Sequence, residues 1–135
     1  TFTFNSFATF QNNVAANNSD GGIFNFGGVF SFLAGASFDG NIASSNGEQG
    51  KGGGIYNYDG GDTTLASPTS FTNNEAHRGG AFLNRNTDES FEERYGRAYK
   101  TPTITYPADT VFEGNQSFID ICPDIAFELD ETCGL

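Results

Sequence analysis

The stretch SFTNNEAHRGGAF, residues 70–82, decides the fold of this chain because its pattern recurs three more times. An aromatic residue is followed three positions later by asparagine, then two positions later by a small residue. After a gap come two glycines and an apolar residue. The same order appears in TFQNNVAANNSDGGIF (9–24) and SFDGNIASSNGEQGKGGGIY (37–56), and in VFEGNQSFIDICPDIAF (111–127), where Pro-Asp replaces Gly-Gly. Four copies indicate an internal repeat and a stacked architecture.

The shared positions form four sets. They are the aromatic Phe10, Phe38, Phe71 and Phe112, the asparagine Asn13, Asn41, Asn74 and Asn115, the small Ala15, Ala43, Ala76 and Ser117, and the apolar Ile23, Ile55, Ala81 and Ile125. The gaps between the sets vary, and no 3.6-residue period connects them, which argues against a helical repeat. Short alternating segments bounded by Gly, Asn, Asp and Ser favour strands instead. We therefore predict an all-β parallel β-helix, or solenoid, of about four to five coils.

In such a stack each coil lies about 4.8 Å above the last, so like residues lie on like. The aromatic and apolar sets are predicted to fill the interior. The asparagines are predicted at a bend, because Asn tolerates the left-handed backbone region and stacked amides hydrogen-bond from coil to coil. These sets are therefore interpreted as architectural, and the chain as a single β-helix domain over residues 1–135.

The repeat also resembles a known family. Phe38 and Asn41 with Gly53-Gly54-Ile55, and Phe71 and Asn74 with Gly79-Gly80-Ala81, are similar to the repeats of chlamydial polymorphic outer-membrane proteins. The resemblance spans residues 9–127. It implies a right-handed β-helical passenger or stalk with roles in adhesion and surface display, and it implies no catalytic residues.

Composition limits the possible partners. Seventeen acidic and six basic residues give a formal net charge of −11. Such a body repels phosphates, so nucleic acid is not an expected partner. No apolar run is long enough to form a transmembrane segment, and no signal peptide is seen. The absence of Met indicates a processed protein or a fragment of a longer stack.

Two cysteines, Cys122 and Cys133, fall in the expected C-terminal capping coil, residues 118–135. We predict a disulfide between them that closes this coil, with a pair of free thiols as the alternative. In the chain-entropy model a loop of this length is worth roughly 3 kcal/mol. A disulfide would place the protein in an oxidising compartment, either extracellular or at the cell surface, or an organelle lumen such as the thylakoid lumen.

The search for catalytic chemistry finds little. The lone histidine, His77, is interpreted as a surface residue beside Arg78, and the carboxylates recur at no fixed motif position. No metal or cofactor is expected. The turn YDGGDTT, residues 58–64, faintly resembles a glycine-aspartate calcium turn, but one copy favours a plain turn. Asn17, in a loop sequon, is a weak candidate for glycosylation.

The most informative departure from the repeat is an inserted loop, residues 86–102. Phe91, Tyr95 and Tyr99 recur every fourth residue, which predicts one face of a short helix. Glu93 and Arg97 would form a favourable pair on it. The residues predicted to bind a partner are Phe91, Arg94, Tyr95, Arg97, Tyr99 and Lys100, because Tyr and Arg suit interface hot spots. The alternative is a loop that only covers the wall.

Three functions remain open on these observations. The first is a non-enzymatic structural or adhesin-like module that acts by protein–protein contact. The second is an accessory subunit docked on the lumenal side of a membrane complex, such as a photosynthetic one. The third is a pectate-lyase-like carbohydrate-active enzyme, because those enzymes share the β-helix; they need a carboxylate cluster on the wall.

Overall fold

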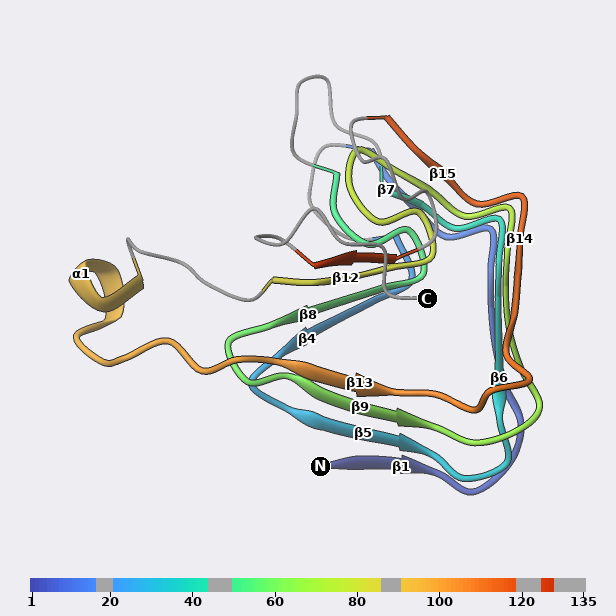
Figure 1. The fold of residues 1–135 in the computed structure, drawn as a ribbon, viewed down its shortest axis with the longest axis horizontal. Coiled ribbons are helices and arrows are strands. Elements are labelled where there is room, and N and C mark those ends of the chain that lie inside the picture. Colours follow the sequence, from blue (N-terminus) through green and yellow to red (C-terminus); the bar gives the residue numbers. More distant parts are fainter. Residues whose placement is uncertain (17–20, 44–49, 86–90, 119–124, 128–135) are drawn as a thin grey trace.

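The repeats fold into stacked coils of a parallel β-helix, which confirms the predicted fold class (Figure 1). The structure is a computed structural model, and it describes residues 1–16, 21–43, 50–85, 91–118 and 125–127. Within these residues four parallel sheets, A to D, contain four strands each. Each turn of the chain passes through sheets B, C, D and A in that order. The view in Figure 1 shows the resulting closed outline around one interior.

Within every sheet the strands stack in chain order, from the N-terminal coil onward. Sheet A holds β1 (Phe2–Phe4), β5 (Val29–Phe32), β9 (Asp62–Leu65) and β13 (Thr103–Thr105); sheet B holds β2 (Ala8–Gln11), β6 (Ala36–Asp39), β10 (Thr69–Thr72) and β14 (Val111–Glu113); sheet C holds β3 (Val14–Ala15), β7 (Ile42–Ala43), β11 (Glu75–Ala76) and β15 (Gln116–Ser117); sheet D holds β4 (Ile23–Phe26), β8 (Ile55–Tyr58), β12 (Phe82–Asn84) and β16 (Ile125–Phe127). One helix, α1 (Phe91–Tyr95), lies outside the outline between β12 and β13.

The aromatic column of the repeat lies inside sheet B. Phe10, Phe38, Phe71 and Phe112 pair in register. Their rings are nearly parallel, with centroids 5.0, 4.7 and 5.4 Å apart. Phe38 and Phe71 are fully buried. Because successive coils repeat at the strand spacing, identical flat rings stack at van der Waals distance, and this explains why the repeat holds phenylalanine at this position.

The asparagine ladder lies at the corner between sheets B and C. The amides of Asn13, Asn41 and Asn74 each donate from Nδ2 to Oδ1 of the asparagine in the next coil, over 2.8 to 2.9 Å. In the later three coils Nδ2 also donates to the carbonyl of the preceding coil's phenylalanine, over 2.9 Å in each case. Buried amides are thereby satisfied coil by coil, which an apolar residue at this corner would not achieve.

The bend itself is made by the residue before the ladder asparagine. Asn12, Gly40, Asn73 and Gly114 have φ angles of 54°, 63°, 55° and 66°. These values lie in the left-handed region, where asparagine and glycine are favoured. The prediction that the ladder asparagine itself adopts this conformation is therefore wrong by one residue. The alternation of Asn and Gly before each ladder position is the signal that identifies the bend.

The apolar column inside sheet D differs from the prediction in one coil. Ile23 pairs with Ile55, and Ile55 pairs with Phe82, not with Ala81. Ile125 pairs with Phe82 in turn. The predicted alignment of the third copy is one residue too early. Gly79-Gly80 match Gly52-Gly53, and not Gly53-Gly54, which directly precede Ile55. Ala81 fits beside Gly54, whose added Cβ would meet the Ala81 carbonyl oxygen at 2.5 Å.

A second buried asparagine column was not predicted. Asn25, Asn57 and Asn84 pair in register within sheet D. Asn57 donates from Nδ2 to Asn84 Oδ1 over 2.9 Å, and Thr63 Oγ1 donates to Asn57 Oδ1 over 2.8 Å. This column links sheet D to sheet A near the corner where β8 turns into β9. The segments IFNF, IYNY and FLN carry the signal, an asparagine two residues after the inward apolar residue.

The predicted features of cysteine and glycan chemistry lie outside the described residues. Cys122 and Cys133 belong to the segments 119–124 and 128–135, and Asn17 belongs to 17–20. The disulfide, the C-terminal capping coil and the glycosylation of Asn17 stay predictions.

Candidate binding surface

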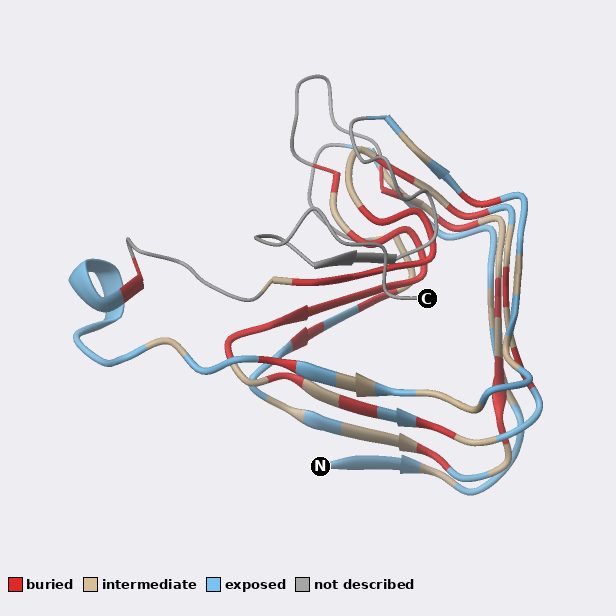
Figure 2. Cartoon of the chain, in the orientation of Figure 1, coloured by how far each residue is buried: buried red, intermediate tan, exposed pale blue. Residues whose placement is uncertain are grey.

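The outer face of sheet D is built from aromatic residues. Along a strand, alternate side chains point to opposite faces, so Phe24 and Phe26 of β4 and Tyr56 and Tyr58 of β8 point outward. Phe24 stacks on Tyr56 with centroids 5.2 Å apart, and Phe26 lies 5.5 Å from Tyr58. Figure 2 shows that β8 is buried along its whole length, on both faces. Something therefore covers the outside of β8.

The cover is the inserted segment. Phe91 is fully buried and forms, with Tyr56, Tyr58 and Leu83, a second hydrophobic cluster outside the solenoid interior. The Phe91 ring lies 5.9 Å from Tyr58 and 5.3 Å from Tyr99, both edge-on. Burial of a phenylalanine side chain stabilises by about 1.5–3 kcal/mol relative to exposure. This contact anchors the insertion to coils two and three.

The helix of the insertion is short because the sequence ends it. Glu92 and Glu93 occupy the first turn and Arg94 the last, which suits the helix dipole. Gly96 then adopts a φ of +67°, and its N–H donates to the Glu92 carbonyl over 2.8 Å. Glycine after the last helical residue is the usual C-terminal cap. The prediction that Tyr99 continues the helical face of Phe91 and Tyr95 is therefore wrong, since Tyr99 follows the cap.

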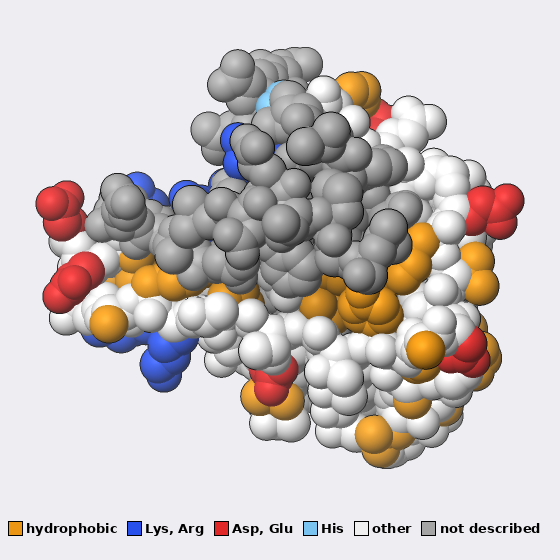
Figure 3. Space-filling model, viewed as in Figure 1, with side chains coloured by type: hydrophobic (Ala, Val, Ile, Leu, Met, Phe, Trp, Pro, Cys, Tyr) orange, Lys and Arg blue, Asp and Glu red, His pale blue; other side chains and the backbone are white. Residues whose placement is uncertain are grey.

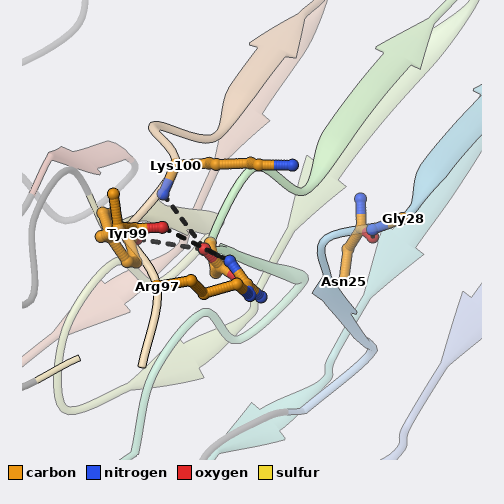
Figure 4. Close-up of polar contacts among 7 residues, drawn as sticks. Asn25, Gly28, Arg97, Tyr99 and Lys100 are labelled. Carbon is orange, nitrogen blue, oxygen red and sulfur yellow. Dashed lines mark hydrogen bonds and ion pairs between the residues drawn. The ribbon is translucent and has the colours of Figure 1, made fainter. Parts of the chain in front are cut away.

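Behind the helix, the insertion is fastened to the buried carboxylate of Asp59 (Figure 4). Arg97 makes a two-point ion pair with Asp59, with Nη1 3.1 Å from Oδ1 and Nη2 bound to Oδ2. The Lys100 N–H donates to Oδ1 over 3.0 Å. The Tyr99 hydroxyl accepts the Asp59 N–H over 3.1 Å and donates to the Arg85 carbonyl. We call these contacts of Asp59 with Arg97, Tyr99 and Lys100 the clasp. Arg97 therefore pairs with Asp59 and not, as expected, with Glu93.

Two opposing causes set the ionisation of Asp59. Burial raises the pKa of this carboxyl, but the hydrogen bonds from Arg97 and Lys100 and their positive charges lower it by more. The net pKa is below its usual range, so the carboxylate is charged at neutral pH. The same pairing raises the pKa of Arg97. Asp59 is thus a structural anchor for the insertion. Both of its carboxylate oxygens accept hydrogen bonds from Arg97 and Lys100 of the same chain.

The cover leaves part of the aromatic face open. Phe24, Phe26 and Tyr95 are 47%, 44% and 50% exposed. Phe26 lies 6.2 Å from both Phe24 and Tyr95, so the three rings are contiguous. We call these three residues the aromatic patch. Contiguous exposed apolar surface marks an interaction site more often than scattered exposed residues do.

The basic residues of the chain concentrate near this wall, although α1 also carries the exposed Glu92 and Glu93. All six Lys and Arg residues lie between Lys51 and Lys100, although acidic residues are spread along the chain. Three of the cations sit over outward rings of this cluster, Lys51 over Tyr56, Arg85 over Tyr58 and Arg97 over Phe91, at 5.7, 5.5 and 4.8 Å. Figure 3 shows Lys and Arg side chains beside α1 together with acidic side chains at the same edge, whereas the charged side chains visible at the opposite edge are acidic.

The structure separates the six residues predicted to bind a partner. Phe91 is buried, and Arg97 and Tyr99 bind Asp59 and Arg85 of the same wall. Arg94, Tyr95 and Lys100 are exposed.

Two further residues of this surface, Phe24 and Phe26, were not predicted because they come from the first coil. Their signal is an aromatic residue at both outward positions of the segment IFNF, repeated in IYNY of the next coil.

Other chemistry is sparse in the described residues. Among them, no three His, Cys, Asp or Glu side chains lie close enough together to hold a metal ion. His77 lies in the turn after β11, where its carbonyl accepts from Ser117 Oγ over 3.0 Å. Across the same residues, no helix has both the length and the apolar character that a membrane crossing requires.

Comparison with known proteins identifies the repeat. Residues 35–58 match the family model described as the Chlamydia polymorphic membrane protein repeat. This segment covers β6, β7 and β8, which is most of the second coil. No curated protein matches the chain, and no solved structure matches it. The chain is thus a parallel β-helix, and the resemblance of its repeat to that of the polymorphic membrane proteins is confirmed for this coil.

Proposed function

We propose that the protein is a non-enzymatic, adhesin-like binding module that presents the aromatic patch of sheet D to a protein partner. The observation that carries the proposal is the arrangement of Phe24, Phe26 and Tyr95 as three contiguous exposed rings on a buried aromatic base. A rigid base reduces the entropy lost on binding, and aromatic anchors beside arginine are the usual hot spots of protein interfaces. The family of the repeat is a family of membrane proteins, which agrees with display at a surface.

Charge gives the partner a further property. The protein is strongly negative as a whole, yet Arg94 lies next to Tyr95 on α1, and the Arg97 side chain is 47% exposed although it pairs with Asp59. An acidic patch on a partner would be attracted to this wall and repelled elsewhere, which orients the encounter. We expect the protein to be extracellular or at the cell surface. These are oxidising environments, in which the predicted disulfide Cys122–Cys133 would persist.

The alternative is an accessory subunit that docks on the lumenal side of a membrane complex, for example in a thylakoid lumen. It would bind its partner through the same surface, but in a different compartment. Both readings predict a protein partner and no cofactor. The carbohydrate-active enzyme has less support, because neither His77 nor the described carboxylates form a cluster on one wall.

The test uses a double variant, Phe26→Ser with Tyr95→Ser, in the organism that makes the protein. Intact cells are labelled with a membrane-impermeant reagent, and the size of the native complex is measured after gentle extraction. We expect the reagent to label both the wild type and the double variant at the cell surface. We expect the larger complex to be lost in the double variant only. The matched control is Phe118→Ser, which removes a comparably exposed ring elsewhere. A variant that stays in the complex contradicts the proposal, and labelling only after lysis shifts it to the lumenal location.

A further inference from the structure

The insertion holds an exposed segment between two anchors. Residues 92–98 are all exposed, and Figure 2 shows that α1 is buried only at its start. Phe91 fixes the beginning of this segment in the aromatic cluster, and the clasp fixes its end through Tyr99 and Lys100. At Gly96, no described atom outside the neighbouring residues lies within 4 Å of the position that a Cβ would take. Exposed loop tips of this kind are the preferred sites of proteolytic nicking.

The segment opens at little cost to the rest of the fold. A helix as short as α1, with five residues, is marginal by itself. Its last turn is closed by the Gly96 N–H, which donates to the Glu92 carbonyl over 2.8 Å. Because the two anchors lie on either side of this turn, α1 unwinds locally while Phe91 and the clasp stay in place. Cleavage of a transiently opened segment follows the population of its open form, so a marginal helix favours cleavage.

The basic residues of the chain differ in how far they are engaged. All six lie in the described residues. Five of them are held on their own wall: Lys51 and Arg85 lie over Tyr56 and Tyr58, Arg78 pairs with Lys51 in a β-bridge, Arg97 binds Asp59, and the stem of Lys100 packs against Gly60. A basic residue held in this way by its side chain or its backbone is not free to enter the specificity pocket of a protease.

Arg94 is the exception among the six. It is exposed in the last turn of α1, and within the described part of the chain it makes no hydrogen bond, ion pair or ring contact. It also lies midway between Phe91 and Arg97, so exposed backbone flanks it on both sides. An acidic pocket, as in trypsin, accepts an arginine side chain. Of the six bonds that such a protease could cut, the one after Arg94 combines a free side chain with an accessible backbone.

We infer that the peptide bond between Arg94 and Tyr95 is a processing site for an arginine-specific endoprotease. Water adds across this bond, so Arg94 gains a free carboxylate and Tyr95 a free ammonium group. Glu92 and Glu93 occupy the two positions before Arg94. They favour a protease whose neighbouring subsites are basic and disfavour one whose subsites are acidic, which restricts the enzymes that cut here.

Cleavage at this bond falls within the aromatic patch. Tyr95 is held there by α1 and by the Phe91 ring, whose centroid lies 4.5 Å from that of Tyr95. After the cut Tyr95 begins a new chain and is no longer part of a helix, so the patch loses one of its three rings. The two pieces stay together, because β13 pairs with β9 and β14 pairs with β10 across the cut. Loss of partner binding on cleavage rests on the proposed function, whereas the cleavage itself does not.

The test is limited digestion of the purified 135-residue chain with trypsin, followed over time by mass spectrometry. We expect a first cut that yields residues 1–94 and 95–135, and we expect these pieces to elute together from a native sizing column. Arg94→Gln removes the site and is expected to slow the first cut at least about tenfold. The matched control is Lys100→Gln, which removes the exposed basic side chain at the other end of the segment and is expected to be cut like the wild type.

A first cut after any other basic residue, or equal rates for Arg94→Gln and Lys100→Gln, would overturn the inference. Use of the site is tested by N-terminal sequencing of the protein isolated from the organism that makes it. We expect a fraction of the molecules to contain a chain that begins at Tyr95 and that is absent from an Arg94→Gln strain. If the wild type contains no such chain, the inference is overturned as well. None of these measurements involves a partner, so their failure is distinct from the failure of Phe26→Ser with Tyr95→Ser to lose the complex.

Discussion

The outer faces of sheets B and D differ, although the same repeat builds both. Apart from Val111, the outward residues of sheet B are small or polar. Some of them bind one another at the surface: Thr72 Oγ1 donates to Asp39 over 2.7 Å, and Ser70 Oγ donates to Ser37 over 3.3 Å. Outward residues of sheet D are aromatic in β4 and β8, and the insertion covers those of β8 together with Leu83 of β12. The interior residues determine the geometry of each coil, so the outward residues of a sheet are free to vary. A specific contact is therefore expected on the sheet whose outward residues are apolar and not polar.

The largest expected effect lies in the interior that both faces share. Phe71→Ala removes a fully buried ring between Phe38 and Phe112 and leaves a cavity that a stack of coils cannot close. We expect the free energy of unfolding to fall by about 3–5 kcal/mol, measured by urea denaturation. A loss below about 1 kcal/mol would mean that the stacked phenylalanine rings contribute little to the stability of the β-helix.

The second effect separates the two faces. Phe91→Ala removes the anchor of the insertion, and we expect a loss of about 2 kcal/mol, less than for Phe71 because the insertion can open locally. Hydrogen exchange should speed up in residues 91–102 and in β8, and stay unchanged in β6 and β10 of sheet B. The control is Glu92→Ala on the exposed side of α1. Equal protection of residues 91–102 in both variants would contradict the anchoring role.

The third effect depends on pH. Asp59→Asn removes the charge from the clasp without strain, since asparagine tolerates the φ of 47° at this position. We expect a loss of about 1 kcal/mol at neutral pH. The folded pKa lies below the unfolded value, so the charged clasp stabilises fully above the unfolded pKa, about 3.9, and this contribution is lost as pH falls through the lowered folded pKa. Chemical denaturation of both proteins from pH 7 downward should show their difference shrinking in that acid range. A difference that grows on acidification would refute the clasp.

The smallest effect is on sheet B. Hydrogen bonds from Thr72, Asn73 and Gln11 lower the pKa of Asp39, but the group lies at the surface and these donors are all neutral. We expect Asp39→Asn to change the free energy of unfolding by no more than about 0.5 kcal/mol. A change as large as that of Asp59→Asn would remove the contrast between the two faces.

The sequence predicts the stack well because the repeat occurs four times. Phe10, Phe38, Phe71 and Phe112 could be aligned without a structure, since stacking demands the same residue in each coil. The register of sheet D could not be fixed in the third coil, where Gly79, Gly80 and Ala81 offer two alignments with Gly52, Gly53 and Gly54. The glycine pattern gives no side-chain volume to distinguish them, and only the pairing of Phe82 with Ile55 decides.

The candidate surface was predictable in part. Aromatic and basic residues concentrated in the insertion indicated its importance, but not which side chains turn inward. Phe91 and Arg97 were expected to face a partner, and they find an aromatic base and a buried carboxylate on their own wall. That outcome depends on Asp59 and Tyr58, some thirty to forty residues away, and on Phe26 in another coil. Such contacts between coils have no signature within the insertion itself.

The contrast between the two sheets can be decided by site-specific photocrosslinking in intact cells, with a photoreactive phenylalanine analogue at Tyr95 or at Val111. Both positions are about half exposed, so the probes differ mainly in their place: Tyr95 lies on α1, which covers sheet D, and Val111 lies on the outer face of sheet B. We predict a discrete protein adduct from position 95 and none from position 111. Adducts from both positions in equal yield, or from position 111 alone, would contradict the assignment of the binding surface to sheet D.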